Sequence, residues 1–284
     1  MTLLAGLKLL IAASIVLSVF SLALRTRAAD IAYLFRHRGA LSRALLAMFV
    51  VMPAIALAVV LAFELKPGVE VALLVLSLSP VPPLLPGKQL KSGGEGAYIT
   101  GLLVTAALFS LVAMPLGLHL FAAVFGREVD VPAAGMAKTL AITIAVPMLA
   151  GFVAQKLLGG RADAVSRATY RIGMLMLLAG AVALLVVLLP AMERLVGGGT
   201  LAALLGMILV GLAAGYLLGG PSPHDRAALA LATATRHPGV ALGVAGGLFP
   251  DEKQALIAIL VSVILNFIVG IPLVRLLRRN APTD

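Results

Sequence analysis

The sequence contains no cysteine and no tryptophan, and only 12% of its 284 residues are charged. The absence of cysteine excludes disulfides, zinc fingers, iron–sulfur centres and thiol nucleophiles. The scarcity of charge excludes a soluble globular domain of this length, because such a domain needs polar residues for its exterior. The chain also has no Walker loop, no His-Glu-x-x-His segment and no nucleophile triad. We therefore expect neither an enzyme nor a bound cofactor or metal.

The chain is instead rich in apolar segments. Hydrophobic residues make up 61% of it, and its mean hydropathy is +1.11. At roughly 20 apolar residues per span, this length predicts an all-α, polytopic membrane protein of about nine transmembrane helices, with residues 1–284 forming a single transporter unit. The expected spans lie at about 3–24, 42–63, 69–90, 96–125, 133–155, 168–192, 200–219, 226–249 and 254–275.

The basic residues predict the orientation of the chain. With the N-terminus outside, the inner loops and tail hold fourteen Lys and Arg residues and the outer segments hold six. Because cytoplasmic loops are enriched in Lys and Arg, the N-terminus is expected outside and the C-terminus in the cytoplasm, in a bacterial inner membrane. The same bias accounts for the net charge of +10 without a nucleic acid partner.

Two basic residues, Lys88 and Arg236, belong to neither group. Both fall within or at the edge of apolar spans, whereas all twelve acidic residues fall in predicted loops or at helix ends. A charge at the bilayer centre costs at least about 2.5–3.5 kcal/mol, so such a residue indicates a functional site by default. An interior with two cations and no carboxylate suits an organic anion.

Both cations lie beside breaks in their spans. The span near 69–90 is interrupted by four prolines within seven residues, beginning at Pro80, and the span near 226–249 is interrupted at Pro238 and Gly239. Proline removes a backbone donor and disfavours helix in the residue before it. Unwound backbone is tolerated at membrane depth only where it is buried in protein or lines a cavity. Two interrupted spans, one in each half, are typical of an inverted-repeat transporter site.

The predicted site combines the basic residues with nearby polar groups and flexible backbone. The basic residues attract the anion, the polar side chains orient it, and glycine allows close approach of the backbone. The predicted substrate-binding residues are Lys88, Gln89, Thr233, Thr235, Arg236, His237 and Asn266. The predicted hinge residues are Pro80, Pro86, Gly87, Pro238 and Gly239.

Structural alternatives remain open for three of these residues. Lys88 is also compatible with a solvated loop, Arg236 with bonds to backbone carbonyls, and Asn266 with a hydrogen bond between helices. Gly211, Gly215 and Gly219 recur at a spacing of four. This small-residue stripe predicts close helix packing.

Several segments resemble one known family. They are Asp30–Pro53 with Phe35-Arg36-His37-Arg38 and Met52-Pro53, the proline-rich break near Pro80, Met148–Leu158, and the break near Gly239. In order and spacing they resemble the bile acid:sodium symporter family over nearly the whole chain. The resemblance implies panel and core domains related to inverted repeats, in the nine-helix form. Two discontinuous helices would cross in the core beside the substrate crevice.

The chain departs from the family at the expected sodium ligands. Sodium-using members carry Ser and Asn after the first break, Glu before the second, and Gln on an earlier helix. These positions fall near Leu84 and Leu85, at about Ala232, and at Met48. The Gln and Asn of the second break fall at Arg236 and His237. The resemblance therefore implies a member without the usual sodium ligands. The two intramembrane cations then favour the hypothesis that Lys88 and Arg236 supply fixed positive charge in place of sodium.

The sequence thus predicts a secondary active transporter of a small organic anion, working by alternating access in the lipid bilayer. Transport would be sodium-independent or coupled to a proton, which Lys88 is suited to carry because desolvation or a neighbouring cation lets lysine lose its proton. An anion channel with the same cations, or a sodium-coupled carrier of the bile acid symporter type, remains the alternative.

Overall fold

The structure is a computed structural model that describes residues 3–82, 96–125, 138, 141–192 and 199–279. These residues form helices, and none of them forms a strand. Five helical stretches are long and apolar enough to cross a membrane, and they are Arg38–Ala62, Gly96–Val124, Ala141–Ala183, Thr200–Leu218 and Lys253–Gly270. The prediction of an all-α polytopic membrane protein is confirmed, whereas the number of nine spans stays a prediction.

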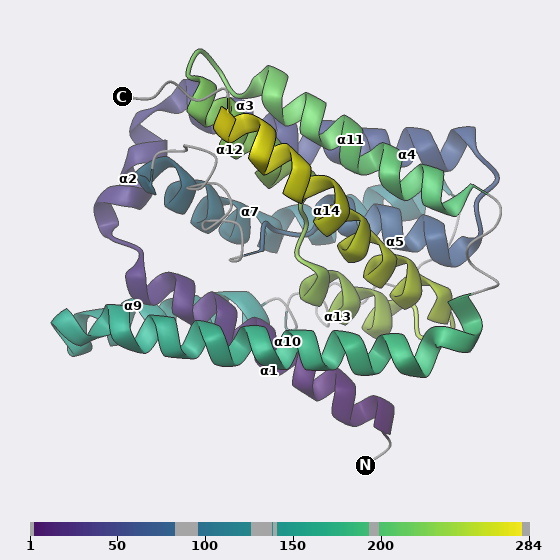
Figure 1. The fold of residues 1–284 in the computed structure, drawn as a ribbon, viewed down its shortest axis with the longest axis horizontal. Helices are drawn as coiled ribbons and strands as arrows, with labels where there is room; N and C mark the ends of the chain where they lie inside the picture. Colours follow the sequence, from purple (N-terminus) through teal and green to yellow (C-terminus); the bar gives the residue numbers. More distant parts are fainter. Residues whose placement is uncertain (1–2, 83–95, 126–137, 139–140, 193–198, 280–284) are drawn as a thin grey trace.

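Three helices form a layer of their own, which we call the panel layer (Figure 1). It consists of α1 (Leu3–Arg25), α9 (Val146–Leu158) and α10 (Ala162–Met192). Small and polar residues let these helices approach closely. A Cβ added to Gly151 of α9 would lie 2.6 Å from the Cβ of Ala23, and the hydroxyl of Ser166 on α10 donates to the carbonyl of Ser21 at 2.7 Å. Short contacts of this kind are typical of helix pairs in membranes.

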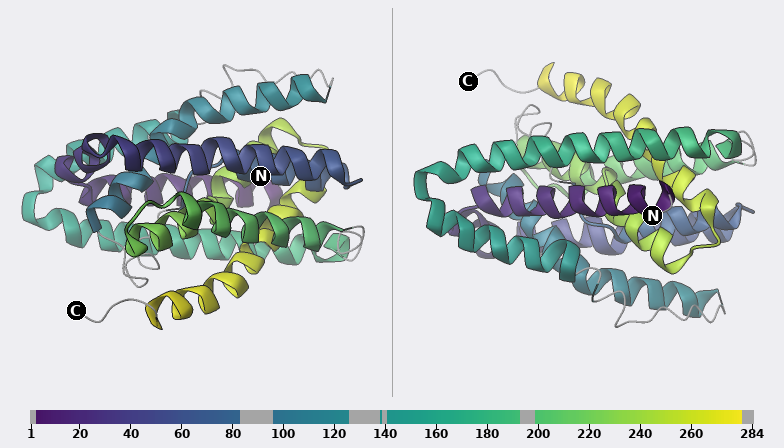
Figure 2. Two further views of the ribbon diagram at one scale, coloured as in Figure 1. Left: turned by 90° about the horizontal axis from the view of Figure 1, so that it is seen from above. Right: turned by 90° about the horizontal axis from the view of Figure 1, so that it is seen from below.

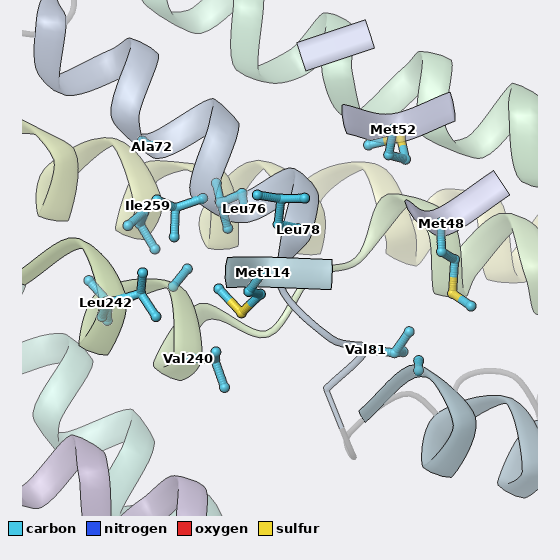
Figure 3. Close-up of a cluster of buried hydrophobic side chains, with 14 of the residues drawn as sticks. Met48, Met52, Ala72, Leu76, Leu78, Val81, Met114, Val240, Leu242 and Ile259 are labelled. Carbon is cyan, nitrogen blue, oxygen red and sulfur yellow. The ribbon is translucent and has the colours of Figure 1, made fainter. Parts of the chain in front are cut away.

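The other helices pack into a second layer, which we call the core layer; it lies above the panel layer in Figure 1 and faces the viewer in the left view of Figure 2. It contains α2 (Ala28–Arg36), α3 (Arg38–Leu46), η1 (Ala47–Val51), α4 (Met52–Ala62), α5 (Pro67–Leu78), α7 (Gly96–Val124), α11 (Thr200–Leu218), α12 (Pro223–Ala234), α13 (Pro238–Leu248) and α14 (Lys253–Arg279). Figure 3 shows its apolar centre, where Leu76 and Leu78 of α5 lie among residues of η1, α7, α13 and α14. Dense packing here fixes the ends of the interrupted helices.

The predicted glycine stripe lies between α11 and α12. A Cβ at Gly215 would lie 2.6 Å from the Cα of Ala230, and one at Gly219 would overlap the backbone of Arg226. Real Cβ atoms do not approach a backbone so closely, so only glycine permits this helix spacing. The expected role of the stripe in packing is confirmed.

A π-helical turn, η1, precedes the proline of α4. The amide of Met52 donates to the carbonyl of Ala47, five residues earlier. In the same register the carbonyl of Met48 requires an amide hydrogen from residue 53, but that residue is Pro53 and has none. The turn therefore leaves the Met48 carbonyl without a backbone donor. A second π-helical turn, η2 (Ala141–Ala145), comes just before Pro147 in the same way.

Candidate functional site

The end of α5 meets the break between α12 and α13. Helix α5 ends at Leu78, and the unwound chain continues through Pro80. Helix α12 ends at Ala234, and α13 begins at Pro238. The amide of His237, in the second break, donates to the carbonyl of Pro80, in the first, at 2.8 Å. Each unwound segment thus supplies a hydrogen-bond partner for a backbone group of the other, and buried irregular backbone requires such partners.

Arg236 is a basic residue of this crossing, and its side chain is 4% exposed. Its Nη1 donates to the carbonyl of Ser79 at 3.1 Å, and its Nη2 donates to the carbonyl of Met48. The centre of the guanidinium lies 5.9 Å from the centroid of the Phe49 ring. A fork of donors on one planar group can bridge two separate segments in this way, which a lysine ammonium cannot do with the same geometry.

Both acceptors are carbonyls that helical bonding leaves free. Ser79 follows the last residue of α5 and precedes Pro80, and Met48 lacks a backbone donor because of Pro53. Arg236 itself follows the C-terminal end of α12. Helix C-termini carry partial negative charge, so the ends of α5 and α12 favour a cation between them.

This geometry bears on the two interpretations of Arg236 that the sequence left open. Its two terminal nitrogens are bonded to backbone carbonyls, and the residue also lines the cavity described below, so its role in binding an anion stays a prediction. The structural alternative, in which carbonyls hold the guanidinium, describes these contacts. The Nε atom is buried and has no hydrogen-bond partner among the described residues.

His237 is the N-cap residue of α13 and is 2% exposed. Its Nδ1 accepts from the amide of Val240 at 3.4 Å, as the side chain of an N-cap residue does. On that assignment Nε2 carries the proton, and Nε2 is buried without a partner among the described residues. A Cβ at Gly239 would lie 2.8 Å from Ile15 of α1. The start of α13 therefore lies against the panel layer.

The remaining polar residues of the predicted site separate into two places. The hydroxyl of Thr233 donates to the Leu229 carbonyl of its own helix at 2.7 Å and lies in the contact between α12 and α11. In contrast, Thr235 donates to Oδ1 of Asn266 at 3.2 Å, and Nδ2 of Asn266 donates to the carbonyl of Ser262 at 3.3 Å. Asn266 thus links the second break to α14.

A cavity of about 140 Å³ lies beside this link. It brings together four predicted residues, namely Thr235, Arg236, Pro238 and Asn266. Thr233 and His237 do not line it. Its other walls are Leu76, Pro82, Met174, Leu204, Met207, Ile208, Ala234, Ser262 and Val263.

Sequence reasoning missed most of these walls. Ser262 lies four residues before Asn266, so helical periodicity points to the same face of α14. In contrast, Met174, on α10 of the panel layer, carries no signal in the sequence that marks it as a cavity residue.

Four predicted residues lie outside the described part of the chain, and they are Lys88, Gln89, Pro86 and Gly87. Leu84 and Leu85 lie outside it as well. Of the other positions that replace sodium ligands, Met48 and Ala232 are fully buried apolar side chains. Among the described residues, no group of three or more His, Asp or Glu side chains is placed to hold a metal ion.

The end of α5 and the break between α12 and α13 meet beside a cavity in an all-α membrane protein, and this arrangement is typical of membrane transporters. A model of the Sodium Bile acid symporter family matches residues 12–197, and the chain belongs to this family. The recognition made from the sequence is confirmed, and the protein is an integral membrane transporter of the sodium/bile acid symporter type. No curated protein matches the sequence. The family match ends before α11, so the break that carries Arg236 lies beyond the matched residues.

Proposed function

We propose that the protein carries a small organic anion across the membrane by alternating access, and that the positive charge of Arg236 makes sodium unnecessary at the crossing. The observation that carries this proposal is the position of the guanidinium, which bridges the carbonyls of Ser79 and Met48. Arginine is effectively always protonated. The crossing therefore holds a permanent cation.

Carbonyls of unwound backbone and the C-terminal ends of half-helices are the groups that coordinate sodium in transporters with broken helices. Here the Ser79 carbonyl, at the C-terminal end of α5, and the Met48 carbonyl, which lacks a backbone donor, already bind a guanidinium. The side chains of Met48 and Ala232 contain no oxygen with which to bind a sodium ion. Backbone carbonyls of the kind that can coordinate a sodium ion thus bind the side chain of Arg236 instead.

A fixed cation next to the cavity favours an anion inside it. A unit negative charge roughly 6 Å from the guanidinium gains roughly 3 kcal/mol at an effective dielectric constant near 20, which is about a hundredfold in affinity. The backbone carbonyls reduce this gain, but no Asp or Glu occurs among the described residues that line the cavity. Arg236 therefore attracts an anion through its field, while Asn266, whose Oδ1 accepts from Thr235, supplies a hydrogen bond from its amide nitrogen. Lys88 and Gln89 stay candidate ligands of the same anion, whereas His237 does not line this cavity.

The cavity lies at a depth that suits a transport site. Met207 is near the middle of α11, and Met174 and Asn266 are near the middle of α10 and α14. Its walls come from both layers, because Met174 belongs to the panel layer and the others to the core layer. Movement of the panel layer against the core layer would open the cavity to one side of the membrane and then to the other. With no sodium at the crossing, a proton or the anion gradient itself drives the cycle.

Uptake into proteoliposomes tests the proposal. Labelled benzoate, isovalerate and taurocholate would be offered with sodium fully replaced by choline, with and without an inward proton gradient. We expect uptake of at least one small carboxylate in choline at a rate within about twofold of that in sodium. A strict requirement for sodium would overturn the proposal, and so would the failure of all three anions to enter under either condition.

Variants of Arg236 assign the effect to its charge. Arg236→Gln introduces the residue type that the family resemblance implies at this position, and we expect it to lower sodium-free uptake at least tenfold. Arg171→Gln is the matched control, because Arg171 is exposed on α10. Equal uptake by the two variants, with equal amounts of monodisperse protein, would rule out the role of Arg236.

A further inference from the structure

We infer that the cavity selects carboxylates with a compact apolar body, no larger than a single ring or a short branched chain, and that Met174 sets the size limit. The inference rests on the proposed function and names the substrate class of the same site. Three observations carry it: the volume of the cavity, the chemistry of its walls, and the contribution of one residue from the panel layer.

The volume bounds the size of the substrate. The cavity measures about 140 Å³. An apolar cavity of about 150 Å³ holds one benzene molecule, whereas drug-sized ligands occupy pockets of about 300–1,000 Å³. The fused rings of a bile acid belong to the second group. A benzoate or isovalerate body fits the space, and a steroid body does not.

The walls bound the chemistry of the substrate. Nine of the thirteen lining residues are apolar, and they include Met207 and Ile208 from α11. The polar residues gather on the second break and α14, where Thr235 is bonded to Asn266. An anion made only of polar atoms would leave most of these walls without favourable contacts. The substrate therefore has an apolar body and one polar end.

The polar end is oriented by Asn266 and Arg236. One hydrogen on Nδ2 of Asn266 is directed to the carbonyl of Ser262, and an amide nitrogen carries two hydrogens. The second hydrogen is available to a carboxylate oxygen. Because Arg236 lines the same cavity, its positive charge favours an ionised oxygen at this end over a neutral one.

Met174 is the residue of the panel layer that lines the cavity. The other residues that line it belong to the core layer or to its breaks. Methionine is an unbranched, adaptable side chain that fills irregular gaps, so shortening it enlarges the space without adding a polar group. Its neighbour Leu175 provides a matched control on the same helix, because Leu175 is 65% exposed and does not line the cavity.

Ligand binding to the purified full-length chain, followed by its thermal unfolding, tests the size limit. The probes are acetate, isovalerate, benzoate, 2-naphthoate and taurocholate, with methyl benzoate as the uncharged counterpart. From the transfer free energy of the extra carbon atoms, isovalerate should bind about fifty times more tightly than acetate. We expect benzoate to bind at least tenfold more tightly than taurocholate, and at least tenfold more tightly than methyl benzoate.

The variants separate a size limit from a general effect on folding. Met174→Ala should raise the affinity for 2-naphthoate relative to benzoate by at least tenfold, whereas Leu175→Ala should leave this ratio unchanged. Equal ratios in the two variants, or equal binding of benzoate and taurocholate by the natural sequence, would overturn the inference and leave the proposed function standing. A complete lack of binding by every carboxylate would overturn the inference and count against the proposed function as well.

Discussion

The carbonyl of Met48 accepts a hydrogen bond from Arg236, and Pro53, five residues further on, is the reason that this carbonyl is free. The π-helical register of η1 directs the Met48 carbonyl toward residue 53, which has no amide hydrogen. The guanidinium supplies the missing donor from a segment 188 residues away. A backbone carbonyl that the π-helical turn leaves free in one half of the chain is thus hydrogen-bonded by a cation from the other half.

Pro53→Ala tests this match. The new amide hydrogen competes with Arg236 for the Met48 carbonyl, so we expect sodium-free uptake to fall several-fold, while thermal stability is kept or increased because a proline is removed from a helix. Uptake and the unfolding midpoint would be measured on the same preparation.

Pro147→Ala is the control for that substitution. Pro147 also follows a π-helical turn, η2, but Arg236 binds no carbonyl there. If both alanine variants change uptake to the same extent, the Met48 carbonyl has no special role.

Gly215→Ala tests the closeness of α11 and α12. The added Cβ would lie 2.6 Å from the Cα of Ala230 and from the carbonyl oxygen of Leu229. Because backbone atoms cannot move aside as a flexible side chain does, we expect a loss of about 1–3 kcal/mol in stability. The measurement is the thermal unfolding midpoint in detergent.

Gly206→Ala, on the same helix, is the matched control, because a Cβ there meets no atom within 4 Å. It should be neutral or slightly stabilising, since alanine favours helix over glycine. A Gly215→Ala protein as stable as Gly206→Ala would contradict the packing that we describe.

His237→Asn and His237→Ala, compared with each other, test the cap of α13. Asparagine keeps a side-chain acceptor for the Val240 amide and alanine does not, so the alanine variant should be less stable by about 1 kcal/mol. Both variants lack the buried Nε2 atom. The loss of this atom therefore does not contribute to the difference in stability between the two variants. Equal unfolding midpoints would show that the contact of 3.4 Å stabilises nothing.

Several features of the fold follow from local chemistry and could be predicted from the sequence. Proline and glycine mark the breaks at Pro80 and Pro238 because they restrict or release the backbone. The depth of Arg236 follows from the apolar residues around it, and the stripe at Gly215 follows from helical spacing. Each of these signals lies within about twenty residues of the feature it predicts.

What the sequence could not predict depends on distant partners. The direction of the Arg236 side chain is set by carbonyls at Met48 and Ser79, and no periodicity indicates which carbonyls are free. Thr233 lies two residues from Thr235, yet it faces α11 because α12 is still helical there, whereas Thr235 follows the end of that helix. Met174 reaches the cavity only through the packing of the two layers.

The bond between the His237 amide and the Pro80 carbonyl has a mechanical consequence. It ties the unwound segment of one half to that of the other, so a displacement of either break is transmitted directly to its counterpart. The two breaks would then move together as one rigid unit during a transport cycle. The movement between the two layers would take place at the apolar contact between Ile15 of α1 and the beginning of α13.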